Sequence, residues 1–272
     1  MKILFIGDIN GKPGRWACAN VLPELKKKHL FDFCIANSEN AAGGFGLTRE
    51  IAQKIYHYKV DVQTSGNHIW DRREIVTYLD ATPKLLRPAN YPEGTPGFGY
   101  GLFDAHNGSK VGVINLMGRT FMADTDCPFR KAESILKELK DKTKIIIVDF
   151  HAEATSEKQS MGWFLDGRVS AVIGTHTHVQ TADERIFPGG TAFITDVGMT
   201  GPYESVIGVR KEDALERFLT QLPKRMALAD KDVRLCGLLV EIDPTTGQAQ
   251  KVERLNIPVE MDASGAFDAE QL

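Results

Sequence analysis

Short apolar segments that alternate with amphipathic ones are the feature that most limits how this 272-residue chain can fold. In the first third of the chain, strand-like runs lie at residues 2–7, 32–37 and 61–66, and helix-like segments lie at residues 14–29, 48–58 and 69–79. The helix-like segments repeat their apolar residues at helical spacing, so this part predicts a βαβαβα order with a parallel sheet. Pro23 lacks the amide donor that a helix needs, so we expect a kink or a second helical segment there.

The rest of the chain is denser in strand-like runs, which lie at residues 111–116, 145–150, 171–174, 191–196 and 235–242. Residues 87–101 are rich in Pro, Gly and Tyr and predict a surface excursion rather than a linker, because apolar strands resume directly afterwards. The sequence has no internal repeat and no convincing boundary. It therefore predicts a single α/β domain over residues 1–272, with a polar tail at 261–272 that is poorly ordered or contacts a partner.

The charge balance limits the classes of partner. There are 33 Lys and Arg residues against 36 Asp and Glu residues, a net charge of −3, so stable binding to nucleic acid or to an anionic membrane is not expected. The apolar run that starts at Ile3 is broken by Gly7 and Asp8 and is too short for a signal peptide or a membrane span, which predicts a cytoplasmic protein. The four cysteines show no C-x-x-C spacing and are expected to be reduced, mostly buried thiols.

Residues that can bind metals follow directly after predicted strands. They occur in GD at 7–8, NSEN at 37–40, GNH at 66–68, FH at 150–151 and GTHTH at 174–178. In open α/β sheets, ligands bind beyond the carboxyl ends of the strands, so these groups are expected to converge on one site. The residues that we assign to it are Asp8, Glu39, Asn67, His68, His151, His176 and His178.

The mixture of carboxylates, an amide and imidazoles suits Mn, Fe, Zn or Co better than Mg or Ca. The set contains no cysteine, which argues against a structural zinc site. Glu39 is the best candidate for a carboxylate that bridges two cations, which would lie about 3.5–4 Å apart. Two such cations favour phosphate ester hydrolysis by a bridging hydroxide, and His68 would then protonate the leaving alkoxide.

The details of the loops are open at this stage. An extended backbone at residues 176–178 would place both imidazoles on one side, where each could serve a different metal. The glycines of residues 41–46 are either loop punctuation or part of a lid, and the turn at 200–203 could also close over a ligand.

Taken singly, several of these residues have simpler explanations. Asp8 could cap a helix, Asn67 could belong to a turn, and His151 could be an ordinary buried histidine. The complete set makes a metal site the better interpretation. Three histidines without matching partners, His29, His57 and His106, are expected at the surface. Two tryptophans, Trp70 and Trp163, are expected in the core.

At these residues the sequence resembles the calcineurin-like metallophosphoesterase superfamily, whose pattern is GD, a second acidic motif, GNH, a lone His and G-H-x-H. It is more similar to the YmdB-like bacterial branch, through ILFIGDINGKPGR, NSENAAGGFGLT, SGNHIWD, DFHAEATSEK, GTHTHVQTAD and TDVGMTGPYESVIG. The wider superfamily has a histidine where Asn10 stands and an aspartate where Glu39 stands. Both departures match the YmdB-like branch, and the first is expected to weaken one metal position.

The resemblance implies a four-layer α/β/β/α sandwich of two mixed sheets. It implies one metal held by Asp8, Glu39 and His178 and a second held by Glu39, Asn67, His151 and His176, with Asn40 and His68 contacting substrate. The implied activity is hydrolysis of small phosphodiesters, with 2′,3′-cyclic or 3′,5′-cyclic nucleotides as substrates. The implied cofactors are two divalent ions, Fe or Mn with Zn or Co as alternatives, and the implied assembly is a homo-oligomer, a dimer or a tetramer.

Two other functions fit part of the pattern. Metal-dependent amidohydrolases also use HxH with carboxylates, but they carry HxH early in the chain and lack GNH after a strand. A regulatory protein with a structural or sensing metal site and little turnover would not need His68 as a proton donor. The native metal, the physiological substrate, the oligomer size and the pathway are not determined by the sequence.

Overall fold

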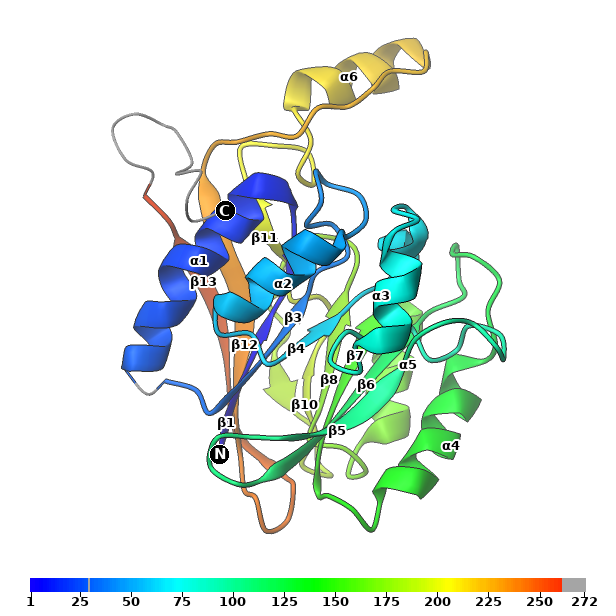
Figure 1. The fold of residues 1–272 in the computed structure, drawn as a ribbon, viewed down its shortest axis with the longest axis vertical. Helices are drawn as coiled ribbons and strands as arrows, with labels where there is room; N and C mark the ends of the chain where they lie inside the picture. The colour runs from blue at the N-terminus through cyan, green and yellow to red at the C-terminus, as the bar shows by residue number, and fades with distance from the viewer. Residues whose placement is uncertain (29, 261–272) are drawn as a thin grey trace.

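Two β-sheets face each other in the computed structural model, which describes residues 1–28 and 30–260 (Figure 1). His29 and the tail at 261–272 therefore lie outside the described residues, and the predictions made for them are not taken further. The first sheet has the order β2-β11-β12-β1-β3-β4, with β13 paired to β12. Its strands are β1 (Lys2–Ile6), β2 (Asp8–Ile9), β3 (Phe33–Asn37), β4 (Val62–Thr64), β11 (Met199–Pro202), β12 (Val233–Ile242) and β13 (Ala249–Pro258).

The second sheet has the order β5-β6-β7-β8-β10-β9. Its strands are β5 (Tyr100–Asp104), β6 (Lys110–Met117), β7 (Ile145–His151), β8 (Ala171–Thr175), β9 (Arg185–Ile186) and β10 (Ala192–Ile194). Both sheets are mixed. Strands β1, β3 and β4 run parallel, as predicted, whereas β12 is antiparallel to β1; likewise β6, β7 and β8 run parallel and β5 is antiparallel to β6.

Alternate residues of the central strands enter different layers of the core, because successive side chains of a strand point to opposite faces. Ile3 and Phe5 of β1 lie between the two sheets, together with Ile147 of β7. Leu4 of β1 points instead to the outer face of the first sheet, and Val148 of β7 points to the outer face of the second. Three apolar layers result, and they require helices on both outer faces.

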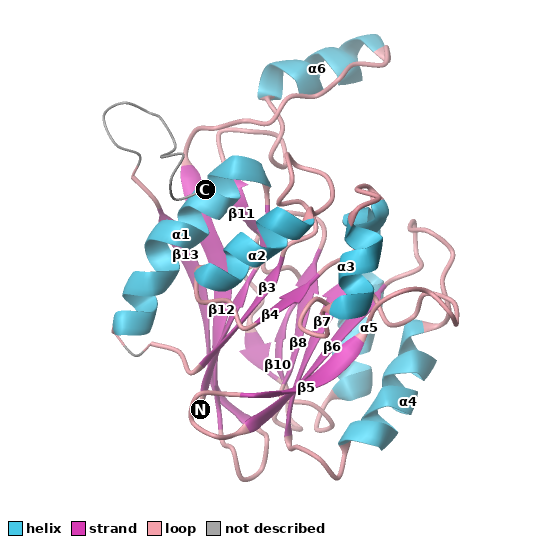
Figure 2. Cartoon of the chain, in the orientation of Figure 1, coloured by secondary structure: helices cyan, strands magenta, loops and turns pink. Residues whose placement is uncertain are grey.

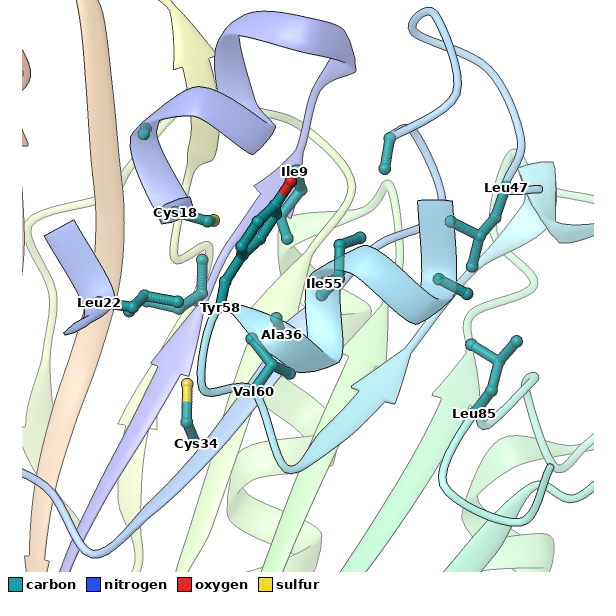
Figure 3. Packing of buried hydrophobic residues seen from close by; sticks show 14 of the residues in the cluster. Ile9, Cys18, Leu22, Cys34, Ala36, Leu47, Ile55, Tyr58, Val60 and Leu85 are labelled. Carbon is teal, nitrogen blue, oxygen red and sulfur yellow. The ribbon is translucent and has the colours of Figure 1, made fainter. Parts of the chain in front are cut away.

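The helices occupy those two faces (Figure 2). The first sheet is covered by α1 (Gly11–Lys27), α2 (Arg49–His57) and α3 (Ile75–Ala81), and the second by α4 (Pro128–Leu139) and α5 (Thr155–Leu165). Figure 3 shows Cys18 and Leu22 of α1 and Ile55 of α2 packed over Ala36 of β3. The predicted four-layer sandwich of two mixed sheets is confirmed, and α6 (Lys211–Thr220) stands away from it (Figure 1).

Several local predictions were wrong. Of the two alternatives at Pro23, a second helical segment is excluded, since α1 continues through this residue, and a kink stays a prediction. The helix expected at 69–79 is divided into a 3-10 turn, η1 (Asn67–Trp70), and the short helix α3. The supposed turn at 200–203 lies largely in β11, which pairs with β2 and β12. The later part also contains α4, α5 and α6, which were not predicted.

The single-residue predictions had mixed outcomes. Trp163 is 54% exposed rather than in the core, and Trp70 is partly buried against Tyr91. His57 and His106 are exposed, as expected. All four cysteines are free thiols, three of them buried, which agrees with the prediction. Within the described part of the chain, no helix combines the length and the apolar character needed to cross a bilayer.

Candidate metal centre

The carboxyl ends of five strands bring the predicted residues to one edge of the sandwich. Asp8 stands in β2, directly after β1, and Glu39 follows β3 by two residues. Asn67 begins the turn after β4, His151 ends β7, and His176 follows β8. Asp8, Glu39 and His151 are buried. This convergence agrees with the rule that ligand sites in open sheets lie beyond the strand ends.

The Nε2 atom of His151 is the centre of the cluster. It lies 2.9 Å from Asn67 Oδ1, 3.0 Å from His176 Nδ1 and 3.1 Å from Glu39 Oε1. Ligand atoms of Glu39, His151 and His176 all lie within 4.8 Å of one another. Four atoms that carry lone pairs therefore face each other, and one imidazole proton cannot satisfy them all. Such a set suits a divalent cation with oxygen and nitrogen ligands.

Asp8 and His178 flank this cluster. Asp8 Oδ2 accepts a hydrogen bond of 3.0 Å from the backbone N–H of His176, whereas buried Asp8 Oδ1 has no hydrogen-bond partner among the described residues. A buried carboxylate oxygen without a partner is costly, and a cation would satisfy it. His178 donates from Nδ1 to the Ile207 carbonyl at 2.9 Å, which leaves Nε2 3.2 Å from Asn40 Nδ2. Asp8 and His178 thus each present a ligand atom beside the cluster.

The protonation of the cluster is uneven. Burial would raise the pKa of Glu39, but His151 and His68 outweigh it and lower that pKa to about 2. Burial would lower the pKa of His151, but Glu39 and Asp8 outweigh it and raise that pKa to about 9. Burial and the neighbouring His151 lower the pKa of His176 to about 3, and burial raises the pKa of Asp8. The carboxylates around His151 thus make its position favourable for positive charge.

The segment at 176–178 has a different backbone from the one predicted. His176 and His178 have φ angles of +102° and +64°, so the chain turns here instead of continuing as a strand, and the two imidazoles do not share a side by strand alternation. Asp196 holds the turn, because its Oδ2 accepts from both the backbone N–H and the hydroxyl of Thr177, at 3.0 and 2.7 Å. Lys158 of α5 donates to the same oxygen at 2.7 Å from a fully buried position.

A buried network of polar side chains contacts His151 on its Nδ1 side. The Thr175 hydroxyl donates to Asp149 at 2.7 Å and accepts from His151 Nδ1 at 2.9 Å, which directs Nε2 toward the cluster. Asp149 also accepts from Thr64 and Asn37. Burial raises the pKa of Asp149 to about 7, although His151 and the hydroxyl donors oppose the rise.

Gly66 is required because the side chains of His151 and Glu39 lie very close to its backbone. A Cβ atom at this position would lie 2.2 Å from the His151 ring and 2.5 Å from Glu39 Oε2. The residue before Asn67 therefore has to lack a side chain if both ligands are to reach the cluster. This explains the glycine of the GNH motif in physical terms.

His68 lies at the mouth of the cluster. Its Nδ1 donates to Asp71 Oδ2 at 2.9 Å, which leaves Nε2 as the atom for a ligand in the cavity. Its backbone N–H donates to Glu39 Oε2 at 3.1 Å, which joins the position of His68 to that of the cluster. A cavity of about 620 Å³ covers the cluster and is lined by Glu39, Asn40, His68, His176 and His178, among others. Its volume is typical of small-molecule sites.

Sequence reasoning missed several residues of this site. Glu153 lies 3.1 Å from His176 Nε2, and Asn10 lines the cavity. Asp149, Thr175, Lys158 and Asp196 act only through other residues. Asp196 had a signal close to that of the predicted site residues, since it ends the strand-like run at 191–196, whereas Asp149 was hidden inside an apolar run.

The sandwich and this arrangement of buried carboxylates, amide and imidazoles define a metallophosphoesterase-type enzyme. The comparisons then give the family. The chain belongs to the YmdB-like protein family, whose family model matches residues 4–255.

Relatives of this chain have phosphoesterase names. It is 51% identical over 257 residues to a 2′,3′-cyclic-nucleotide 2′-phosphodiesterase of Bacillus subtilis (strain 168), a match that covers 94% of this chain and 97% of that one. A solved structure of a novel phosphatase from Mycoplasma pneumoniae is 35% identical with a TM-score of 0.89, over 95% of this chain and 93% of that chain. A hypothetical protein from Thermus thermophilus is 40% identical with a TM-score of 0.88, over 95% and 100% of the two chains.

Proposed function

We propose that the chain is a two-metal phosphodiesterase that opens 2′,3′-cyclic nucleotides. The observation that carries the proposal is the convergence of Asn67, His176 and Glu39 on the Nε2 atom of His151. Beside them lies Asp8 Oδ1, which has no hydrogen-bond partner in the described part of the chain. Glu39, with Asp8 and His178 on one side and Asn67, His151 and His176 on the other, would hold the two ions. Mn or Fe suits this ligand set, with Zn and Co as alternatives.

When bound, divalent ions would neutralise the phosphoryl charge and lower the pKa of a water molecule to near neutral. The protein supplies position and a proton. Asn40, on the cavity wall beside His178, offers its amide to a phosphoryl oxygen. Water adds to phosphorus and releases one proton to solvent, the bond between phosphorus and O2′ breaks, and doubly protonated His68 gives its Nε2 proton to O2′, which yields a nucleoside 3′-phosphate. His68 then takes up a proton from solvent. Asp71 holds the His68 ring in position during this transfer.

The preference for the 2′,3′-cyclic ester over the 3′,5′-cyclic ester is part of the proposal and is supported by the name of the Bacillus subtilis relative. We also propose a single domain over residues 1–272, and an enzyme that acts in the cytosol as a dimer or tetramer. Neither the oligomer nor the location enters the chemistry above.

The test begins with protein stripped by a chelator and reloaded with Mn²⁺. We expect hydrolysis of bis-p-nitrophenyl phosphate and of 2′,3′-cAMP to return with the metal, and 3′-AMP rather than 2′-AMP to be the product of the second. Asp8→Asn should abolish the recovery. His68→Ala should lower turnover by about 10²- to 10⁴-fold while the metal content stays unchanged. No hydrolysis with Mn, Fe, Co or Zn would refute the proposal and favour a regulatory metal protein.

A further inference from the structure

Above the metal cluster the cavity changes character. Its floor is polar, but its upper wall is mostly apolar and is formed by Phe45 together with residues of the segment 206–228, among them Ile207, Phe218 and Leu228. Arg217 and Gln221 are the polar residues of that segment in the wall. Water and phosphate do not require such a wall. Phe45 is 43% exposed and Phe218 is 74% exposed, so neither ring is used to build the core.

Phe45 is fixed next to the proposed proton donor. Its ring meets the His68 ring edge to face, with 5.1 Å between the centroids and an angle of 71° between the planes. Arg72 clamps the loop that carries it, by donating to the carbonyl oxygens of Ala42 at 3.0 Å and Phe45 at 3.3 Å. Arg72 therefore holds the backbone of the segment 41–46 in place beside His68.

The segment 206–228 is anchored against the same loop. A Cβ atom at position 44 would lie 2.6 Å from Leu228 Cδ1. Gly44 also has a φ of +94°, so only glycine admits this contact without strain. Val206 and Val209 exchange backbone hydrogen bonds at the base of the segment, and the Arg210 N–H donates to the Ala227 carbonyl. The apolar wall and the Phe45 platform thus form one surface beside the cluster.

We propose that Phe45, backed by the apolar residues of 206–228, is the nucleobase subsite of this enzyme. This inference rests on the proposed function and extends it to the part of the substrate that does not react. In a cyclic nucleotide one ribose separates the base from the phosphate, and here one ring contact separates Phe45 from His68. An aromatic platform recognises the face of a base, and every base has such a face, so the subsite accepts purines and pyrimidines alike.

The test compares two ligands that differ only in the base: 2′,3′-cAMP and the 2,3-cyclic phosphate of methyl β-D-ribofuranoside. Stacking on one aromatic side chain changes affinity by about 5- to 150-fold. Phe45→Ala should therefore lower kcat/KM for 2′,3′-cAMP by that factor beyond any change that it causes for the base-free ligand, and the difference should lie mainly in KM. Phe45→Trp should restore the loss. Phe121→Ala is the matched control, because Phe121 is 88% exposed and does not line the cavity.

A second readout does not depend on turnover. Calorimetry on the Mn²⁺-loaded protein measures the binding of adenosine 3′-monophosphate and of methyl riboside 3-phosphate to the same variants. A loss confined to the adenosine ligand supports the subsite even if the wild type hydrolyses neither diester, in which case the proposed function alone fails. Equal losses for both ligands, or no loss in Phe45→Ala, overturn the subsite.

Discussion

Replacing Lys158 by methionine should destabilise the protein far more than its distance from the ligands suggests. The Nζ atom of Lys158 lies 2.7 Å from Asp196 Oδ2, and both side chains are only 1% exposed. Methionine keeps most of the apolar stem of lysine and removes the charge. The Asp196 carboxylate would then be buried without a cation, while Thr177 and Gly198 still donate to it.

Removing one partner of a buried ion pair costs about 3–5 kcal/mol, because the remaining charge stays desolvated and uncompensated. Whole domains are stabilised by only about 5–15 kcal/mol. We expect Lys158→Met to lower the free energy of unfolding by about 3–5 kcal/mol in urea titrations followed by circular dichroism. We also expect weaker metal retention, because Asp196 holds the turn that presents His176 and His178.

Two further variants make the prediction sharp. Lys211→Met breaks an ion pair with Glu204 that is just as short, at 2.6 Å, but about half exposed, and should change the stability far less, because solvent screens exposed charges. The double variant Lys158→Met with Asp196→Asn removes both charges and should be more stable than Lys158→Met alone. If Lys158→Met costs no more than Lys211→Met, the reasoning from buried charge is refuted.

Three other predictions concern the metal site. Gly66→Ala should reduce the metal bound per chain by at least about tenfold in elemental analysis, because its Cβ would displace His151; full occupancy would contradict the 2.2 Å approach. Thr175→Val removes the hydroxyl between Asp149 and His151 and should weaken Mn²⁺ binding by about 10- to 100-fold, and unchanged affinity would show that the hydroxyl does not orient the ring. Without metal, the His151 proton is kept to about pH 9 in the folded state but lost near pH 6.5 in the unfolded chain. The raised pKa thus stabilises the metal-free fold fully below pH 6.5, and chelated protein should lose up to about 3 kcal/mol of stability between pH 6.5 and 9. Denaturant titrations at several pH values that show constant or rising stability would disprove this.

The sequence alone was sufficient to predict where the strands end and which site residues follow them. The strands at β1, β3 and β7 are strongly apolar, so Asp8, Glu39 and His151 stand out where those runs stop. The parallel order then places them at one edge. Convergence on a single site follows from topology alone, without any knowledge of side-chain conformation.

The sequence could not predict local conformations that depend on residues far away in the chain. The turn at His176 and His178 is determined by Asp196, which lies some twenty residues later in the chain, and local spacing therefore suggested an extended strand. Asp149 looks like an anomaly in an apolar run until Asn37, Thr64 and Thr175 are placed around it. The position of the segment 206–228 above the cluster has no local sequence signal, because it depends on contacts with distant residues, among them Leu228 with Gly44 and the Ile207 carbonyl with His178.

The position of β1 also affects how the protein is made. This strand pairs with β3 on one side and with residues 237–241 of β12 on the other, so the strand that leads into Asp8 is completed only by chain that is synthesised late. Pairings between such distant segments form slowly, and synthesis proceeds from the N-terminus. A ribosome-stalled chain that ends before Val233 should therefore bind no Mn²⁺ even though it contains every proposed ligand, whereas a stalled chain with β12 outside the ribosome should bind it.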